Sequence, residues 1–138
     1  MAAAGTGLAP FRGFIQERAA QIGAGRTLAP AVLFLGCRDP DKDELYRAEL
    51  DKWEKMGAVD IKRAYSRKSE ASHVMDLWDR GAHVFVCGSR ELGEAIRAVS
   101  LRMYKERAEE RGKDSSDETA EKWFDGIRND RYATDVFA

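Results

Sequence analysis

The stretches Ala31-Val32-Leu33-Phe34-Leu35 and His83-Val84-Phe85-Val86-Cys87 decide the fold class of this chain. Each is followed by a glycine, is too short to form a helix, and is apolar at nearly every position. Strands that are apolar on both faces are typical of the interior of a parallel sheet that helices cover on both sides. Both stretches are therefore predicted to be inner strands of such a sheet.

Weaker strand patterns and five helical patterns surround these two strands. The further strands are expected at Val59 to Tyr65 and at Arg131 to Phe137. Helices are expected over Pro10 to Ile22, Asp43 to Met56, a short segment with Val74, Leu77 and Trp78, Glu91 to Arg111, and a segment with Trp123, Phe124 and Ile127. Strands that alternate with helices predict an α/β fold, a doubly wound parallel sheet of about five strands with helices on both faces.

The apolar periodicity also predicts which helical residues face the sheet. The expected inward residues are Phe11, Phe14, Ile15 and Ile22 in the first helix, Leu45, Leu50, Trp53 and Met56 in the second, and Leu92, Ile96, Val99 and Met103 in the fourth. The last helix is predicted to begin at Ser115, because Glu118 follows three residues later at the spacing of a capping box.

Length and composition favour one soluble domain over residues 1–138. The chain has 138 residues and a net charge of -1, so any anion preference must be local, and its basic residues are too diluted by carboxylates to form a nucleic-acid stripe. No signal peptide and no apolar run of about 20 residues is present, which predicts a cytoplasmic domain without a membrane segment and leaves anchoring of a longer parent open. Two cysteines and two histidines predict neither a disulfide framework nor a metal site.

In doubly wound folds ligands bind at the carboxyl ends of the strands. One segment expected there is the turn Gly5-Thr6-Gly7, which runs into a helix with Pro10 in its first turn. Backbone amides and the positive helix end could hold a phosphate there. An ordinary turn is the alternative, because Pro10 stands where the usual dinucleotide fingerprint has its third glycine.

Basic residues follow two other predicted strands. Arg38 stands where a dehydrogenase specific for NAD usually has an acidic residue that binds the ribose. Ser66, Arg67 and Lys68 offer a hydroxyl and two cations that suit a ribose phosphate, and a solvated basic loop is the alternative.

The last two predicted strands end in residues suited to a nicotinamide or a flavin. Cys87, Gly88 and Ser89 would bring a thiol to the mouth of the cleft beside a glycine that leaves room for a flat ring, unless Cys87 is simply a buried structural cysteine. Asp135 and Phe137 would bring a carboxylate and an aromatic face, unless they belong to an edge strand with Phe137 in the core.

Taken in order, these segments resemble the NADP(H)-binding lobe of ferredoxin-NADP reductase-like flavoproteins. The similarity runs through residues 5–14, 34–38, 45–47, 64–67, 86–89 and 131–137. The chain resembles in particular the diflavin reductases that serve haem-thiolate cytochrome P-450 monooxygenases. The resemblance is greatest to those in which haem and reductase domains share one chain.

The resemblance implies a role for each segment. The Thr6 turn would hold the pyrophosphate of NADP(H), Ser66 and Arg67 would take the 2'-phosphate, and Arg38 would support the adenosine. Cys87 and Asp135 would flank the nicotinamide while hydride passes to the flavin, and Phe137 would stack on the flavin ring. FAD, FMN and haem would come from other parts of the parent protein, so the FAD domain of the same chain is the expected partner beside NADPH.

Three departures from the family pattern accompany this similarity. Many relatives carry Trp where Phe137 stands, only fifteen steps separate Ser66 from Gly81 where the family has a longer stretch, and Met1 to Ala4 leave only a stub of the first strand. The expected function is an oxidoreductase domain of the NADPH-haemoprotein reductase type, inactive without its FAD domain and prone to self-association. The alternatives are a binding module without turnover and, less favoured, a stand-alone NADP-dependent dehydrogenase.

Overall fold

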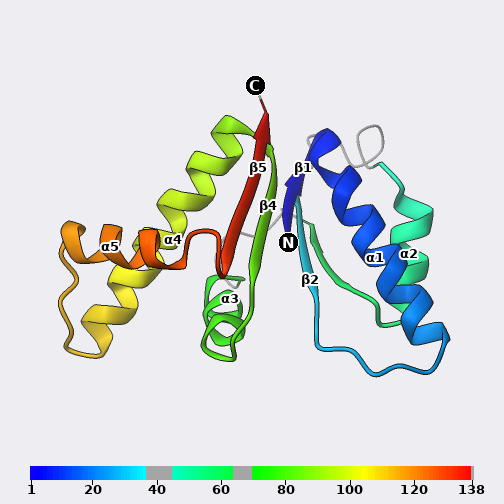
Figure 1. The fold of residues 1–138 in the computed structure, drawn as a ribbon, viewed down its shortest axis with the longest axis horizontal. Helices are drawn as coiled ribbons and strands as arrows, with labels where there is room; N and C mark the ends of the chain where they lie inside the picture. The colour runs from blue at the N-terminus through cyan, green and yellow to red at the C-terminus, as the bar shows by residue number, and fades with distance from the viewer. Residues whose placement is uncertain (37–44, 64–69, 138) are drawn as a thin grey trace.

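A computed structural model describes residues 1–36, 45–63 and 70–137 of the chain. They form one parallel sheet between two layers of helices (Figure 1). The strands are β1 (Ala2–Ala4), β2 (Val32–Gly36), β3 (Asp60–Arg63), β4 (Val84–Ser89) and β5 (Tyr132–Phe137). They lie in the order β3-β2-β1-β4-β5, and every neighbouring pair is parallel. The doubly wound α/β fold predicted from the sequence is confirmed.

The short strand β1 occupies the centre of the sheet. Ala2, Ala3 and Ala4 pair with Phe34, Leu35 and Gly36 of β2, while Ala2 and Ala3 also pair with Val86 and Cys87 of β4. From β1 the chain first adds β2 and β3 on one side of the sheet and then returns to add β4 and β5 on the other side. The position of β1 is the switch point of a doubly wound sheet, next to which ligands bind.

Two helices cover one face of the sheet over β1, β2 and β3. They are α1 (Leu8–Gly23) and α2 (Arg47–Lys55), and they lie together on the right-hand side of Figure 1. Their apolar residues Phe11, Ile15, Leu50 and Trp53 share one core cluster with Leu33, Leu35 and Ile61 of the strands. This cluster anchors the first half of the chain.

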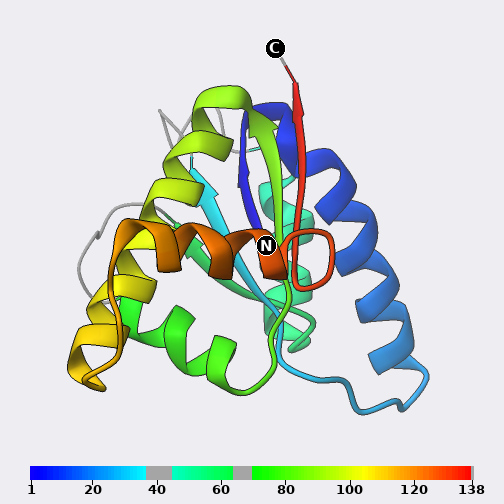
Figure 2. The same cartoon turned by 60° about the vertical axis from the view of Figure 1, so that its left-hand side comes forward.

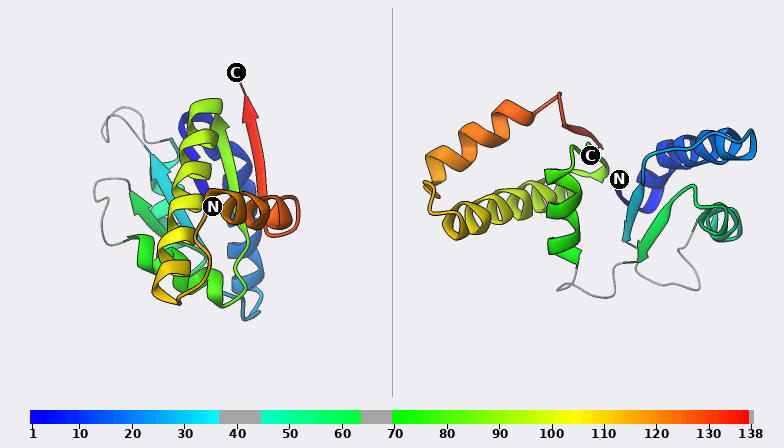
Figure 3. Two further views of the ribbon diagram at one scale, coloured as in Figure 1. Left: turned by 90° about the vertical axis from the view of Figure 1, so that its left-hand side faces the viewer. Right: turned by 90° about the horizontal axis from the view of Figure 1, so that it is seen from below.

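Three helices cover the other face: α3 (Glu70–Asp79), α4 (Arg90–Glu110) and α5 (Asp117–Ile127). Helix α5 lies across the strands rather than along them (Figure 2), and the view from below shows the two helix layers on opposite sides of the sheet (Figure 3). The core of this face consists of Ala2, Val86, Phe124 and Tyr132, with Leu92 and Ile96 packed against them.

Four of the predicted inward residues instead lie at the surface. Phe14 is 53% exposed, Leu45 42%, Met56 39% and Val99 37%. The periodicity identified the buried stripe of each helix correctly but made it too wide. Leu45 and Met56 lie just outside α2, and Phe14 and Val99 lie on the exposed sides of α1 and α4.

The start of α5 also differs from its prediction. Ser116, not Ser115, is the N-cap residue, and its hydroxyl accepts a hydrogen bond from the backbone N–H of Thr119 at 3.3 Å. Ser115 instead donates to Glu109 Oε1 at 3.2 Å. Adjacent serines offer the same capping chemistry, and the path of the loop decides which one is used.

Across the described part of the chain, no helix combines the length and the apolar character needed to cross a membrane.

Candidate functional site

The turn after β1 forms the centre of the candidate site. Residues Gly5–Gly7 make one turn of 3-10 helix and lead directly into α1. Gly5 has a φ of 55°, in the left-handed region that favours glycine, and both Gly5 and Thr6 are exposed. The turn therefore presents backbone to solvent at the switch point of the sheet.

Helix α1 begins two residues earlier than predicted and directs its positive end to the same place. Pro10 is exposed in its first turn, a position that proline tolerates because its missing N–H would have no helical partner. Among the described residues, no side chain caps this helix and no acidic side chain lies in its first turn. The N-terminal partial charge of α1 is thus left uncompensated beside the glycine turn, an arrangement suited to an anion.

Gly7 joins this turn to the end of β4. It is buried, and a Cβ added to it would lie 2.6 Å from the carbonyl carbon of Cys87, 2.9 Å from Gly88 Cα, and closer still to the Cys87 oxygen. These neighbours are backbone atoms, so no side-chain rearrangement could relieve the clash. The approach fixes the distance between the turn and the Cys87 segment.

Cys87 and Asp135 lie side by side on neighbouring strands. They are register partners in the β4–β5 pair, so their side chains emerge on the same face of the sheet. Burial raises the pKa of the Cys87 thiol, and the charge of Asp135 raises that pKa further. Cys87 therefore keeps its proton at neutral pH and is a weak nucleophile.

Ser89 and Phe137 form the outermost pair of the same two strands. The Ser89 hydroxyl caps α4, accepting from the backbone N–H of Leu92 at 3.3 Å. Phe137 is 44% exposed, so it is not packed into the core. Gly88 precedes the cap, and a Cβ on it would lie 2.6 Å from Leu92 Cδ2.

The described part of the predicted site is thus one continuous arrangement at the carboxyl edge of the sheet. It brings together the glycine turn with Pro10, the segment 87–89 and the strand end 135–137. Arg38, Ser66, Arg67 and Lys68 lie outside the described residues. The strands before them, β2 and β3, end at Gly36 and Arg63 on this same edge.

Two residues that the sequence did not single out pack the second half of the sheet, Gly93 beside the candidate site and Arg131 at the opposite edge of the sheet. Gly93 of α4 touches β5, because a Cβ on it would lie 2.8 Å from Val136 Cγ1. Arg131 donates to the carbonyl oxygens of Trp78 at 2.6 Å and Ala82 at 3.0 Å, and its guanidinium lies 3.7 Å from the Trp78 ring centroid. A glycine inside a helix signals close packing in general, but nothing local identifies its partner.

An exposed aromatic pair adjoins the site on the face of α1. Phe14 and Phe85 have ring centroids 6.4 Å apart, and Phe85 is 41% exposed although it lies in an inner strand. Helix α1 contacts β1 and β4 on this face, but it leaves both rings of the pair partly exposed. Ala133, the register neighbour of Phe85 in β5, is half-buried.

Comparison with known proteins identifies relatives of this chain. Residues 1–98 match the family described as oxidoreductase NAD-binding domain. A bifunctional cytochrome P450/NADPH–P450 reductase of Fusarium oxysporum is 54% identical over 98% of the chain. Proteins described in the same way are 45% identical over 100% of the chain in Acremonium egyptiacum and 39% identical over 99% in Bacillus subtilis (strain 168). The chain spans 14% of the length of each.

The alignments also reveal a difference in length. The match to the Fusarium oxysporum protein extends over 150 residues and that to the Acremonium egyptiacum protein over 154, whereas the chain has 138. The relatives therefore contain residues within the aligned region that have no counterpart here.

Proposed function

This chain belongs to the oxidoreductase NAD-binding domain family, and from that membership we propose that it binds NADPH at the carboxyl edge of its sheet and presents the nicotinamide to FAD. The observation that carries the proposal is the backbone contact between Gly7 and Cys87. It holds a phosphate-binding turn at a fixed distance from the strand ends that carry Cys87 and Asp135.

The glycine turn would hold the pyrophosphate. Gly5, Thr6 and Gly7 expose backbone at the uncompensated start of α1, with Pro10 shaping the first turn. Ser66, Arg67 and Lys68 would bind the 2'-phosphate, the guanidinium by two parallel hydrogen bonds and the ammonium as a point charge. Arg38 would support the adenosine side. Selection of NADPH over NADH would then lie with the basic segment rather than with the turn.

Cys87, Asp135, Gly88, Ser89 and Phe137 would surround the nicotinamide. When bound, NADPH supplies a hydride and FAD accepts it. The protonated Cys87 Sγ and the Asp135 carboxylate would orient the ring without reacting covalently, since the thiol remains neutral. The space predicted beside Gly88 for a flat ring is filled by Leu92 instead, and the Ser89 cap keeps the β4–α4 connection rigid. Phe137 would stack on the flavin and move aside for the nicotinamide.

The FAD domain of a longer parent chain would be the partner, and the exposed Phe14 and Phe85 favour docking on the face beside α1. The names of the relatives suggest a parent that passes electrons through FAD and FMN to a haem-thiolate monooxygenase. The second candidate is a nucleotide-binding module with no turnover of its own, which agrees with the lack of a reactive nucleophile at Cys87.

A reductase assay separates these possibilities. NADPH and ferricyanide are added to the chain, with and without a FAD-containing lobe from a reductase of this family. Reduction that requires both parts supports the proposal. Binding of NADPH without reduction in either case supports the binding module, and reduction by the chain alone would contradict both.

A further inference from the structure

An open cavity lies at the opposite edge of the sheet from the candidate cofactor site. Its volume is about 150 Å³, and it is lined by residues of α3, α4, α5 and the segment that follows α4. Asp79 is the last residue of α3, shortly before β4 begins. Arg107 and Arg111 lie at the carboxyl end of α4, and the amino end of this helix lies at the candidate site. The length of α4 therefore separates the two sites (Figure 1).

Aromatic rings form one wall of this cavity. Tyr104 stacks on Trp123 with centroids 4.6 Å apart and planes 20° from parallel, and Trp78 meets Trp123 edge-on at 5.8 Å. All three residues are only partly buried and line the cavity, although Arg131 lies over the Trp78 ring and Tyr104 and Trp123 each cover one face of the other. A planar ring would find both stacking and edge-to-face partners there.

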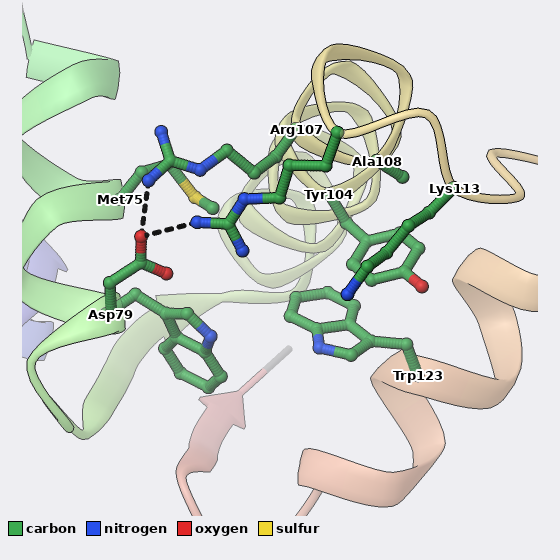
Figure 4. Close-up of a pocket in the computed structure, with 9 residues that line it drawn as sticks. Met75, Asp79, Tyr104, Arg107, Ala108, Lys113 and Trp123 are labelled. Atoms are coloured by element: carbon green, nitrogen blue, oxygen red, sulfur yellow. Dashed lines mark hydrogen bonds and ion pairs between the residues drawn. The ribbon is translucent and has the colours of Figure 1, made fainter.

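Cationic side chains also line the cavity (Figure 4). Arg107 and Arg111 both contact one oxygen of Asp79, Arg111 at 3.1 Å, and the hydrogen bond from Arg107 lowers the pKa of that carboxyl, which stays ionised. Lys113 also lines the cavity, and no carboxylate among the described residues pairs with its ammonium. Three cations against one carboxylate leave an excess charge of +2.

The cations of this cavity can reach a ligand only through their outer nitrogens. Arg107 Nε has no hydrogen-bond partner among the described residues, but it also has no exposed surface that a ligand in the cavity could reach. The excess charge and the aromatic wall favour the same chemical class of ligand.

We propose that this cavity binds a small planar aromatic carboxylate, with its ring on the Trp78–Tyr104–Trp123 wall and its charge facing Arg107, Arg111 and Lys113. A bare inorganic anion would leave the aromatic wall without a partner, and a neutral ring would leave the cations without one. The site is independent of NADPH binding because it lies at the other end of α4.

The three tryptophans of the chain provide the test. Trp78 and Trp123 line the cavity, whereas Trp53 belongs to α2 on the opposite face of the sheet. In a nuclear magnetic resonance titration, benzoate is expected to shift the indole N–H signals of Trp78 and Trp123 saturably, at concentrations of about a millimolar, and to leave Trp53 unmoved. Benzamide and cyclohexanecarboxylate, which lack the charge or the aromatic ring, should bind more weakly.

Substitutions then test which cationic side chains bind the carboxylate of benzoate. Arg111→Gln and Lys113→Gln should each weaken benzoate binding by about tenfold. Lys122→Gln is the matched control: Lys122 pairs with Glu118 on an exposed part of α5 outside the cavity, so the affinity should not change. NADP⁺ should not displace benzoate. The proposal would be overturned if benzamide bound as tightly as benzoate or if NADP⁺ displaced benzoate. It would also be overturned if the signals of all three indoles shifted together, or if the shifts did not saturate.

Discussion

The backbone of Gly7 packs directly against the carbonyl group of Cys87, so closely that a single methyl group on Gly7 would collide with both the carbonyl carbon and the oxygen. This contact connects the turn after β1 with the end of β4. Because Gly7 has no side chain, the turn can lie this close to β4, which sets the geometry of the site. Gly5 is needed for a different reason, since its own backbone has a positive φ that favours glycine.

Gly7→Ala should therefore disturb both the fold and ligand binding. We expect the free energy of unfolding to fall by about 1 to 3 kcal/mol, because the added methyl overpacks a rigid backbone contact. Nucleotide binding should weaken as well, since the turn must move away from β4. Denaturant unfolding and calorimetric titration measure the two effects.

Gly13→Ala is the matched control for this substitution. A Cβ on Gly13 meets nothing within 4 Å, and the residue lies inside α1. Alanine there should raise the free energy of unfolding by up to about 1 kcal/mol, because glycine is the poorer helix former. Equal behaviour of the two variants would contradict the role given to Gly7.

The protonation state of Cys87 should respond to Asp135. Burial raises the pKa of the Cys87 thiol and the carboxylate raises it further, so Asp135→Asn should lower that pKa. Because Cys87 is only 4% exposed, the measurement is the pH profile of its ¹³Cβ signal in nuclear magnetic resonance, in a Cys37→Ser background where one thiol remains. Asp130→Asn, in the exposed turn before β5, should leave the profile unchanged. An unshifted profile for Asp135→Asn would show that the two groups do not interact.

Arg131 should contribute to stability through the shape of its guanidinium. It bridges two carbonyl oxygens and lies over the Trp78 ring, which a lysine ammonium cannot reproduce. We expect Arg131→Lys to lower the free energy of unfolding by about 1 to 3 kcal/mol. Arg102→Lys, at an exposed position of α4, should change it by less than about 0.5 kcal/mol. Similar values for both would refute the bridging role.

The exposed aromatic pair should matter for association rather than for stability. Phe14→Ser should change the free energy of unfolding by less than about 1 kcal/mol, because the side chain is more than half exposed. It should weaken binding to a FAD-containing lobe and reduce self-association of the isolated chain in sedimentation. Val99→Ser, exposed on α4, is the control that should affect neither association. An isolated chain that sediments as a clean monomer would contradict the expected self-association.

The inner strands were predictable from the sequence, and so was the edge of the sheet at which the candidate site residues gather. Val32–Gly36 and Val84–Ser89 are apolar enough to be recognised as inner strands from their sequence alone. Once the strands are inferred to be parallel, the residues that follow each strand are expected at the same edge of the sheet. The exposure of Phe14 and Phe85 was not predictable. Periodicity reports which residues of an element are apolar, but not which of them are covered by other parts of the folded chain.

Within the candidate site, the sequence indicated the segments but not how they are joined. The Gly7–Cys87 contact connects residues eighty positions apart, and only the tertiary structure brings them together. The hydroxyl of Ser89, which the sequence predicts to bind cofactor, also caps α4, a role that depends on where that helix begins. The cavity beside Trp78 and Trp123 has no sequence signature, because its residues come from three helices and a loop.

Binding of NADP⁺ and NAD⁺ to the chain, measured by calorimetric titration, tests the proposed function most directly. We predict that NADP⁺ binds at least about tenfold more tightly, and that Arg67→Ala removes about 1.5 to 3 kcal/mol of its binding free energy while leaving NAD⁺ unaffected, since a charged contact to the 2'-phosphate is lost. Arg102→Ala, on the exposed face of α4, should change neither affinity. Equal affinities of the chain for NADP⁺ and NAD⁺ would contradict the account.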